Sequence, residues 1–193
     1  MRNSPNFLLR CAAEPMHILT PNLRLVPDTS QRQTALLDGA DVFETAFGVR
    51  VALGITDFFQ DVSRERLAAI FSACAGAGWF PGFAIEHQDD NTLIGFCGFK
   101  GPPDSERTVE IGYGLAPGYR GRGFASEAVR TVAGYCFETG RIAVVRAHTL
   151  PEPNASTHVL RKCGFQNIGD VIDPDDPENG LVWRWEKREA SSV

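Results

Sequence analysis

Long apolar runs, paired cysteines and an excess of basic residues are all missing from this sequence. No stretch approaches the roughly 20 consecutive apolar residues that a membrane-spanning helix requires, so we expect no membrane partner. Lys and Arg number 19 against 24 Asp and Glu, and the net charge of −5 argues against general electrostatic binding of nucleic acid. The five cysteines are scattered and form no Cys-x-x-Cys pair: they are Cys11, Cys74, Cys97, Cys136 and Cys163.

This cysteine pattern predicts neither a disulfide framework nor a zinc site, and it favours a reducing, cytoplasmic location. The apolar triplet Phe7-Leu8-Leu9 is interrupted by Arg10 too early for a signal peptide. The four histidines lack metal-site spacing, so we expect no metal. Apolar residues make up 43% of the 193 and charged residues 22%, which is typical of one globular domain. We place that domain at residues 18–188, between a loose arm at 1–17 and a tail at 189–193.

Hydrophobic periodicity and turn residues predict alternating strands and helices. The clearest helical pattern has six apolar positions in register: Ala125, Ala128, Val129, Val132, Ala133 and Cys136. Other helices are expected over 30–37, after Asp61 or Ser63, and over 154–163, with short helical turns in 41–60. Strands are expected at 19–26, 83–87, 92–99, 108–115, 142–148, 165–172 and 181–186. This order predicts an α+β fold, a mixed sheet with helices packed on its faces.

The segment between the strand at 108–115 and the clearest helix carries the chemistry. It reads Tyr119-Arg120-Gly121-Arg122-Gly123-Phe124-Ala125. A helix N-terminus presents unpaired N–H groups and a partial positive charge, and glycines let a phosphate approach them closely. The two arginines add cationic donors. The loop is therefore either an anion cradle, best suited to a pyrophosphate, or a flexible glycine turn with two solvated arginines.

Two other nucleotide-binding motifs fit this loop less well. A P-loop needs Gly-Lys-Ser/Thr at the helix start, where this chain has Gly123 followed by Phe124. A dinucleotide fingerprint would place Ser126 where Gly or Ala belongs, and the acidic residue expected about 20 residues later is not there. Neither pattern is met.

The loop resembles the Arg/Gln-x-x-Gly-x-Gly/Ala signature of the GCN5-related N-acetyltransferases. The segment Glu110-Ile111-Gly112-Tyr113-Gly114-Leu115-Ala116-Pro117 is similar to the branch that contains the ribosomal-protein N-terminal acetyltransferases. Leu150–Ser156 and Leu160–Phe165 extend the likeness, as does the order of elements from 19 to 188. The resemblance implies a mostly antiparallel mixed sheet of about six to seven strands flanked by helices, with two central strands splayed apart.

The resemblance also implies acetyl-CoA as cofactor and an amine as acetyl acceptor. In this family the pyrophosphate binds the signature loop, here the backbone of Arg120, Gly121, Arg122, Gly123, Phe124 and Ala125. The pantetheine arm pairs with the preceding strand, here near Tyr113, Leu115 and Ala116. A free backbone N–H near Leu115 would then polarise the thioester carbonyl.

An amine nucleophile must lose a proton, and a carboxylate is the economical base. Strand alternation places Glu110 on one face with Gly112 and Gly114, a position open to substrate, so Glu110 is the candidate base. The other interpretation is a carboxylate that merely faces solvent. The Trp79, Phe80 and Phe83 aromatics would either wall an acceptor pocket or pack in the core.

The general acid of many relatives is a tyrosine four residues before the Gly-Phe pair, and here that position is Leu160. Ser156 is the substitute that the resemblance favours, although a serine there also suits the first turn of a helix. Pro153 stands where relatives have Asn, so Asn154 either contacts CoA or caps the helix. The acidic residues between 170 and 178 either form a solvated loop or attract a cationic amine near the mouth of the active site.

These residues predict an N-acetyltransferase that acts on a small-molecule or peptide amine by direct attack in a ternary complex. The alternative is a CoA-binding sensor or scaffold of the same fold without turnover, and a Rossmann-type dinucleotide protein comes third. The identity of the acceptor and the choice between monomer and homodimer stay open at the level of sequence.

Overall fold

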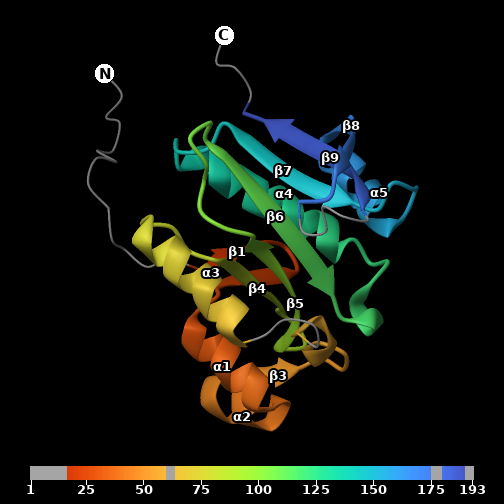
Figure 1. Ribbon diagram of the computed structural model, residues 1–193. Coiled ribbons are helices and arrows are strands. Elements are labelled where there is room, and N and C mark those ends of the chain that lie inside the picture. The colour runs from red at the N-terminus through yellow and green to blue at the C-terminus, as the bar shows by residue number, and fades with distance from the viewer. Residues whose placement is uncertain (1–16, 60–63, 175–179, 190–193) are drawn as a thin grey trace, which may run out of the picture.

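The computed structural model describes residues 17–59, 64–174 and 180–189, and its strands lie side by side in one open sheet (Figure 1). The order is β1-β2-β4-β5-β6-β7-β9-β8, with β3 beside β5. The strands are β1 (Ile18–Leu19), β2 (Leu23–Pro27), β3 (Arg50–Val51), β4 (Gly82–His87), β5 (Thr92–Phe99), β6 (Thr108–Leu115), β7 (Val144–Thr149), β8 (Gln166–Ile172) and β9 (Leu181–Arg188). The helices are α1 (Ser30–Asp38), α2 (Ala40–Phe47), α3 (Arg64–Gly76), α4 (Phe124–Glu138) and α5 (Ala155–Lys162), with 3-10 turns η1 (Thr56–Phe59) and η2 (Pro117–Tyr119).

The expected α+β class and mostly antiparallel sheet are confirmed. Seven strands have five or more residues, and the two-residue strands β1 and β3 bring the described total to nine. The single strand expected over 19–26 is divided by a turn in which the Thr20 N–H bonds to the Leu23 carbonyl at 2.9 Å. The proposed caps Asp61 and Ser63 lie outside the described residues, as does the N-terminal arm up to residue 16.

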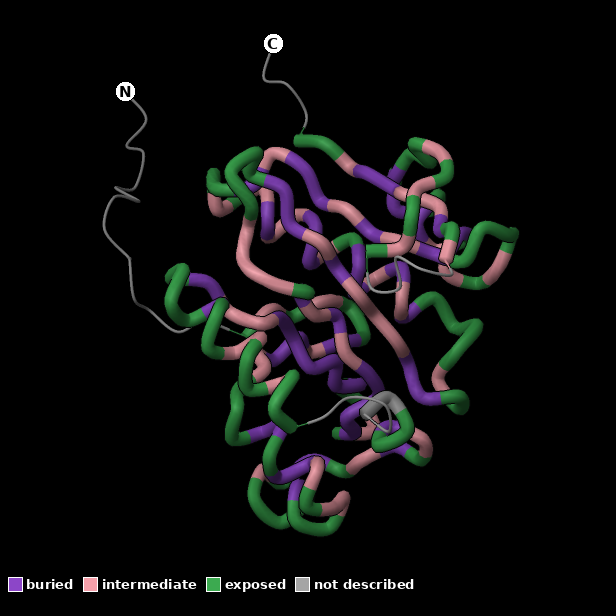
Figure 2. The backbone as a smooth tube through the Cα atoms, viewed as in Figure 1, coloured by how far each residue is buried: buried purple, intermediate pink, exposed green. Residues whose placement is uncertain are grey.

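Helix α4 packs its apolar stripe against the sheet, on the side away from α1 and α3 (Figure 1). Val129, Val132 and Cys136 are fully buried there, as their spacing predicts. Phe80 contacts the ring of Tyr135 from α4 edge to face, at 5.7 Å between centroids. Trp79, Phe80 and Phe83 therefore belong to the core and do not wall an acceptor pocket. In Figure 2, buried residues, coloured purple, lie along the central strands and this helix.

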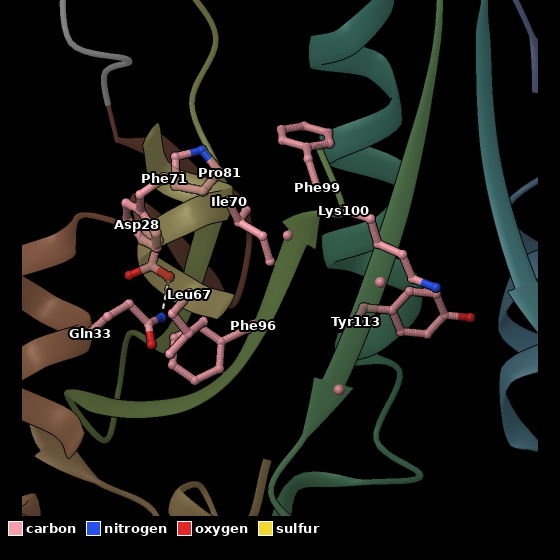
Figure 3. Close-up of a pocket in the computed structure, with 13 residues that line it drawn as sticks. Asp28, Gln33, Leu67, Ile70, Phe71, Pro81, Phe96, Phe99, Lys100 and Tyr113 are labelled. Atoms are coloured by element: carbon pink, nitrogen blue, oxygen red, sulfur yellow. Dashed lines mark hydrogen bonds between the residues drawn. The ribbon is translucent and has the colours of Figure 1, made fainter. Parts of the chain in front are cut away.

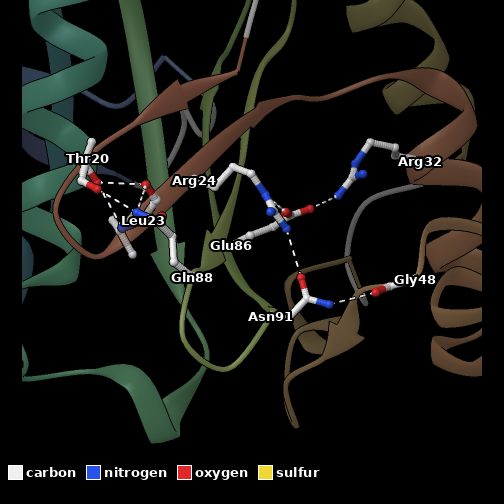
Figure 4. A network of polar contacts seen from close by, with 8 residues as sticks. All are labelled: Thr20, Leu23, Arg24, Arg32, Gly48, Glu86, Gln88 and Asn91. Atoms are coloured by element: carbon white, nitrogen blue, oxygen red, sulfur yellow. Dashed lines mark hydrogen bonds and ion pairs between the residues drawn. The ribbon is translucent and has the colours of Figure 1, made fainter.

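Helix α1 is fixed to the sheet by a buried carboxylate. Glu86 on β4 is 1% exposed and accepts hydrogen bonds from Arg24 of β2 at 2.7 Å and from Arg32 of α1 at 2.6 Å (Figure 4). A buried carboxylate needs such partners, because an unpaired buried charge is strongly destabilising. Thr29 caps the same helix by accepting the Arg32 N–H at 3.2 Å. The first turn of α1 is thus held in a defined place above the sheet.

Strand β6 changes partner along its length, and this produces the expected splay. It pairs with β7 in parallel only over Thr108–Glu110, whereas it pairs with β5 over Ile111–Leu115. The Ala116 N–H donates to Ile94 of β5 at 2.8 Å, and the Lys100 N–H donates to the Glu110 carbonyl at 3.0 Å. Since backbone groups alternate in direction along a strand, the odd residues of β6 direct theirs toward β7. Beyond Glu110, where β7 no longer pairs with it, this leaves an open strand edge.

None of the described helices is long and apolar enough to span a membrane. Among the described residues no group of three or more His, Cys, Asp or Glu side chains is placed to hold a metal ion. The four described cysteines are buried as free thiols. Burial raises the pKa of Cys136 to about 12, so this thiol is not a reactive nucleophile.

Candidate active site

The start of α4 forms an open cradle of backbone N–H groups. Gly121 and Gly123 adopt left-handed conformations, with φ of 72° and 89°, and a Cβ built on either would meet no atom within 4 Å. Gly123 caps α4 without a side-chain hydrogen bond, and the first helical bond runs from the Glu127 N–H to the Gly123 carbonyl at 3.0 Å. The N–H groups of the first turn have no partner within the helix. These features fit a diphosphate.

The two arginines of the loop lie differently. Arg120 turns back and donates from Nε to the Leu115 carbonyl at 2.8 Å, at the end of β6. The Arg122 guanidinium lies over the Phe124 ring at 4.8 Å and near the Tyr119 ring at 5.6 Å. Phe124 itself is 5% exposed, so it offers a phosphate its backbone and not its side chain.

The open edge of β6 lies next to this cradle. Tyr113 and Leu115 direct backbone groups toward the gap, but the Leu115 carbonyl is occupied by Arg120. Ala116, expected to pair with pantetheine, bonds its N–H to Ile94 on the opposite side. The groups left for an extended ligand are therefore those of Tyr113 and the N–H of Leu115.

Glu110 lies where the pairing of β6 with β7 ends, and two other side chains contact its carboxylate. Its Oε1 lies 2.8 Å from Lys100 Nζ on β5 and 3.0 Å from His148 Nδ1 on β7. Burial raises the pKa of the Glu110 carboxyl, but the contacts with His148 and Lys100 outweigh burial, and its pKa is lowered from the ordinary value. Glu110 is therefore a carboxylate at neutral pH, with a second oxygen available to a substrate.

Ser156 lies in the first turn of α5, across the gap from β6. Its carbonyl accepts a hydrogen bond from the Tyr113 hydroxyl at 3.1 Å, which joins β6 to α5. Burial raises the pKa of that phenol, so it keeps its proton. Leu160, at the position of the missing tyrosine, is 1% exposed and packs in the core.

Asn154 is the cap of α5. Its Oδ1 accepts the Thr157 N–H at 3.0 Å, and the Thr157 hydroxyl accepts the Asn154 N–H at 3.0 Å, which completes a capping box. The side-chain oxygen of Asn154 thus caps the helix, and a contact of this residue with CoA stays a prediction.

A cavity of about 270 Å³ opens on the face of the sheet that carries α1 and α3 (Figure 3). Its floor includes Gly98 and Gly112, which are cross-strand partners on β5 and β6. A Cβ on Gly112 would meet no atom within 4 Å, so the sheet leaves room there, whereas a Cβ on Gly98 would lie 3.1 Å from the Pro81 carbonyl oxygen. Its remaining lining residues are Asp28, Gln33, Leu67, Ile70, Phe71, Pro81, Phe96, Phe99, Lys100, Tyr113 and Gly114.

The cavity and the candidate base are adjacent. Lys100 lines the cavity and contacts Glu110, and Gly112 follows Glu110 by two positions on the same face of β6. Sequence reasoning missed Lys100, His148 and Asp28 as site residues. The only available signal for His148 was its place at the end of a strand expected to splay from β6. Of the acidic 170–178 segment, Asp170 belongs to β8, while residues 175–179 lie outside the described part.

Comparison with known proteins agrees with this geometry. The model of the acetyltransferase (GNAT) domain matches residues 53–166. An uncharacterized N-acetyltransferase p20 of Bacillus licheniformis is 30% identical over 125 residues, which is 64% of this chain and 70% of that protein. An uncharacterized N-acetyltransferase YoaA of Bacillus subtilis strain 168 is 33% identical over 105 residues, 54% of this chain and 57% of that protein. The chain thus aligns with little more than half of the length of YoaA.

Solved structures share the fold. The ribosomal L7/L12 alpha-N-protein acetyltransferase RimL, solved in complex with coenzyme A, superposes with a TM-score of 0.66 at 17% identity. The match covers 90% of this chain and 98% of RimL. With the splayed strands, the glycine cradle and the matched domain model together, the chain belongs to the GNAT acetyltransferase family.

Proposed function

We propose that this protein is an acetyl-CoA-dependent N-acetyltransferase that transfers the acetyl group to a primary amine by direct attack in a ternary complex. The observation that carries the proposal is the open edge of β6. It has the uncapped start of α4 at one end and the Glu110 carboxylate at the other. One end suits a diphosphate and the other suits an amine, with an extended strand edge between them.

Acetyl-CoA supplies an activated thioester, and this chain supplies the groups that hold it. The backbone N–H groups of Gly121 to Ala125 receive the diphosphate, supported by the positive end of the α4 dipole. The edge at Tyr113 and the Leu115 N–H receive the pantetheine amides. RimL, which shares the fold, was solved with coenzyme A.

Glu110 accepts the proton that the attacking amine loses. Its Oε1 is held by Lys100 and His148, so Oε2 is the oxygen that receives the proton, directly or through water. A carboxyl with a lowered pKa is a weak base, so its position beside the amine matters, and His148 Nδ1 holds Oε1 at 3.0 Å. We assign His148 as the positioning residue of this pair. Ser156 at the start of α5 then protonates the departing thiolate through its hydroxyl, which regains a proton from water in the same step.

The test is release of the CoA thiol, followed with a thiol-reactive dye against a panel of primary amines and peptides with free N-termini. We expect amine-dependent release that Glu110→Gln lowers by about 100-fold, the lower end of the usual effect of a general base. Glu106→Gln removes an exposed carboxylate from the preceding segment and serves as the control. Tight acetyl-CoA binding without turnover on a broad panel would refute the enzyme and favour a sensor of the same fold.

A further inference from the structure

Two buried oxygen atoms at the α1 end of the cavity have no hydrogen-bond partner. They are Oδ1 of Asp28 and Oε1 of Gln33, and Gln33 as a whole is 5% exposed. The two side chains contact each other through a single hydrogen bond, from the Gln33 amide nitrogen to Asp28 Oδ2 (Figure 3). Rotating the Gln33 amide would place its oxygen against Asp28 Oδ2, remove this hydrogen bond and leave the nitrogen unpaired.

Buried polar groups in proteins are nearly always paired, so two unpaired acceptors side by side need an explanation. Among residues 17–59, 64–174 and 180–189, no cationic side chain hydrogen-bonds to either oxygen, and the buried Nε of Arg32 is itself without a hydrogen-bond partner. Arg32 is next to Gln33 in sequence, but its guanidinium donates to Glu86 at 2.6 Å and stacks over the Phe47 ring at 4.8 Å. Burial raises the pKa of Asp28 to about 7 in spite of the Gln33 hydrogen bond and the Arg32 charge. The pair is therefore set up to receive a donor from outside the chain.

The position of this pair relative to the reaction is fixed by the sheet. The Asp28 N–H donates to the Gly82 carbonyl at 2.8 Å, and Gly82, Gly98 and Gly112 are neighbours on β4, β5 and β6. Three strand spacings separate the backbones of Asp28 and Gly112, about 14 Å. Glu110 lies two residues from Gly112 along β6.

The space between these two ends is apolar. Leu67, Ile70 and Phe71 of α3 line it from above the sheet, and Phe96 of β5 lines it from the sheet itself. A molecule that placed its reacting amine beside Glu110 and filled this space would lie along an apolar wall and end at Asp28 and Gln33.

We propose that Asp28 and Gln33 determine acceptor specificity by selecting amines that carry a second, positively charged group across an apolar body. This inference rests on the proposed acetyltransferase function. Allowing for side-chain reach at both ends, the second group stands about 10 Å from the reacting nitrogen, the span of about three extended residues. The two oxygens are covered by the cavity wall, so the group reaches them with rotamer changes of the kind that are common on binding.

Two kinds of acceptor carry such a second positive charge: a small diamine, and the N-terminus of a peptide with a basic side chain. One arm of the test compares α,ω-diaminoalkanes from hexane to dodecane with n-alkylamines of equal length. The other compares peptides that carry lysine or norleucine at the third position. We expect kcat/KM to be about tenfold or more higher for the charged member of each pair in the arm that represents the true acceptor, as for hydrogen bonds to charged groups.

The variant Asp28→Asn removes the charge with little change of shape, and the preference should then fall to within about twofold. Asp38→Asn is the matched control, because that carboxylate lies at the far end of α1, 48% exposed and paired with Arg64 outside the cavity. Gln33→Met, which removes the second oxygen, should also reduce the preference and replaces the first variant if Asp28→Asn fails to fold.

The outcomes separate the inference from the function on which it rests. If acetyl-CoA binds and no amine is acetylated, the proposed function fails. If amines are acetylated with equal kcat/KM for charged and uncharged members in both arms, the function stands and the inference is overturned. A preference for the charged member that is unchanged in Asp28→Asn and Gln33→Met also overturns the inference, because other residues would then recognise the second positive charge.

Discussion

Replacing Asp28 by asparagine is expected to stabilise the folded protein at neutral and alkaline pH. Burial is the largest influence on this carboxyl and raises its pKa from 3.8 to about 7, against the Gln33 hydrogen bond, the Arg32 charge and the Thr29 backbone N–H. The folded-state pKa thus lies above the unfolded value. Protonation therefore stabilises the native state, fully below the unfolded pKa, and this contribution is lost as the pH rises through the folded pKa.

The magnitude follows from the size of the shift. From 3.8 to about 7 is about three pKa units, and at about 1.4 kcal/mol per unit the ionised carboxylate costs the native state about 4 kcal/mol at most. Asparagine does not ionise and keeps an oxygen for the Gln33 amide. The unfolding free energy of Asp28→Asn minus that of the natural chain should therefore rise by about 1.4 kcal/mol per pH unit between about pH 4 and 7, then level off.

The assay is urea denaturation from about pH 4 to about pH 9, followed by the fluorescence of the tryptophans, of which Trp185 is 1% exposed. Glu110 and Glu127, whose pKa values are lowered, titrate in both proteins and cancel in the difference. Asp38→Asn, which changes a carboxylate that is 48% exposed and lies outside the cavity, is the control variant with which the curve is compared. A flat curve for Asp28→Asn would show that this carboxyl is hydrated, which refutes the reasoning and removes a support of the specificity proposal.

Three further predictions concern the reaction site. Gly123→Val should weaken acetyl-CoA binding about tenfold or more, measured by isothermal titration calorimetry, because a branched side chain would occupy the space that the phosphates need. Gly140→Val is the control. Gly140 lies at the other end of α4 with φ of 66° and equal open space, so this variant has a similar backbone strain and should bind acetyl-CoA normally. The kcat deficit of Glu110→Gln should shrink as the pH rises, because the amine then loses its proton unaided, and a deficit independent of pH would exclude a base role. Tyr113→Phe should lower the free energy of unfolding by about 1 kcal/mol, measured by urea denaturation, because the hydrogen bond to the Ser156 carbonyl is lost. An unchanged free energy of unfolding would show that this hydrogen bond does not stabilise the contact between β6 and α5.

Much of the fold was predictable because its determinants are local. The stripe of α4 follows from apolar spacing, and Gly140 adopts the left-handed conformation expected after a helix. The hairpin of β4 and β5 follows from two apolar runs around a polar turn at 88–91. Burial on one face imposes a period on the sequence, and that period can be read without knowledge of the partner.

Details of the cofactor groove were less accessible, because they depend on contacts that a motif does not encode. Arg120 matches the signature as a cationic donor, yet its Nε donates a hydrogen bond to the Leu115 carbonyl. The Ala116 N–H lies on the β5 side because of the alternation set by pairing over 111–115. In both cases the motif identified the right segment, while the register of the sheet decided which atoms face the gap.

The polar site residues that the sequence did not reveal share one property: the role of each depends on residues that are distant in sequence and adjacent in the folded sheet. His148 is an isolated histidine in sequence, and it enters the site only because parallel pairing of β6 with β7 stops at Glu110 and leaves the two side chains 3.0 Å apart. Asp28 lies just before α1, whose cap is Thr29, and the Asp28 carboxyl accepts a hydrogen bond from Gln33 and lines the cavity. Asp28 as a residue is only partly buried, but its Oδ1 is buried without a hydrogen-bond partner, which costs folding free energy. This unpaired oxygen is the observation on which the proposed acceptor end of the site rests, and no motif in the chain points to it.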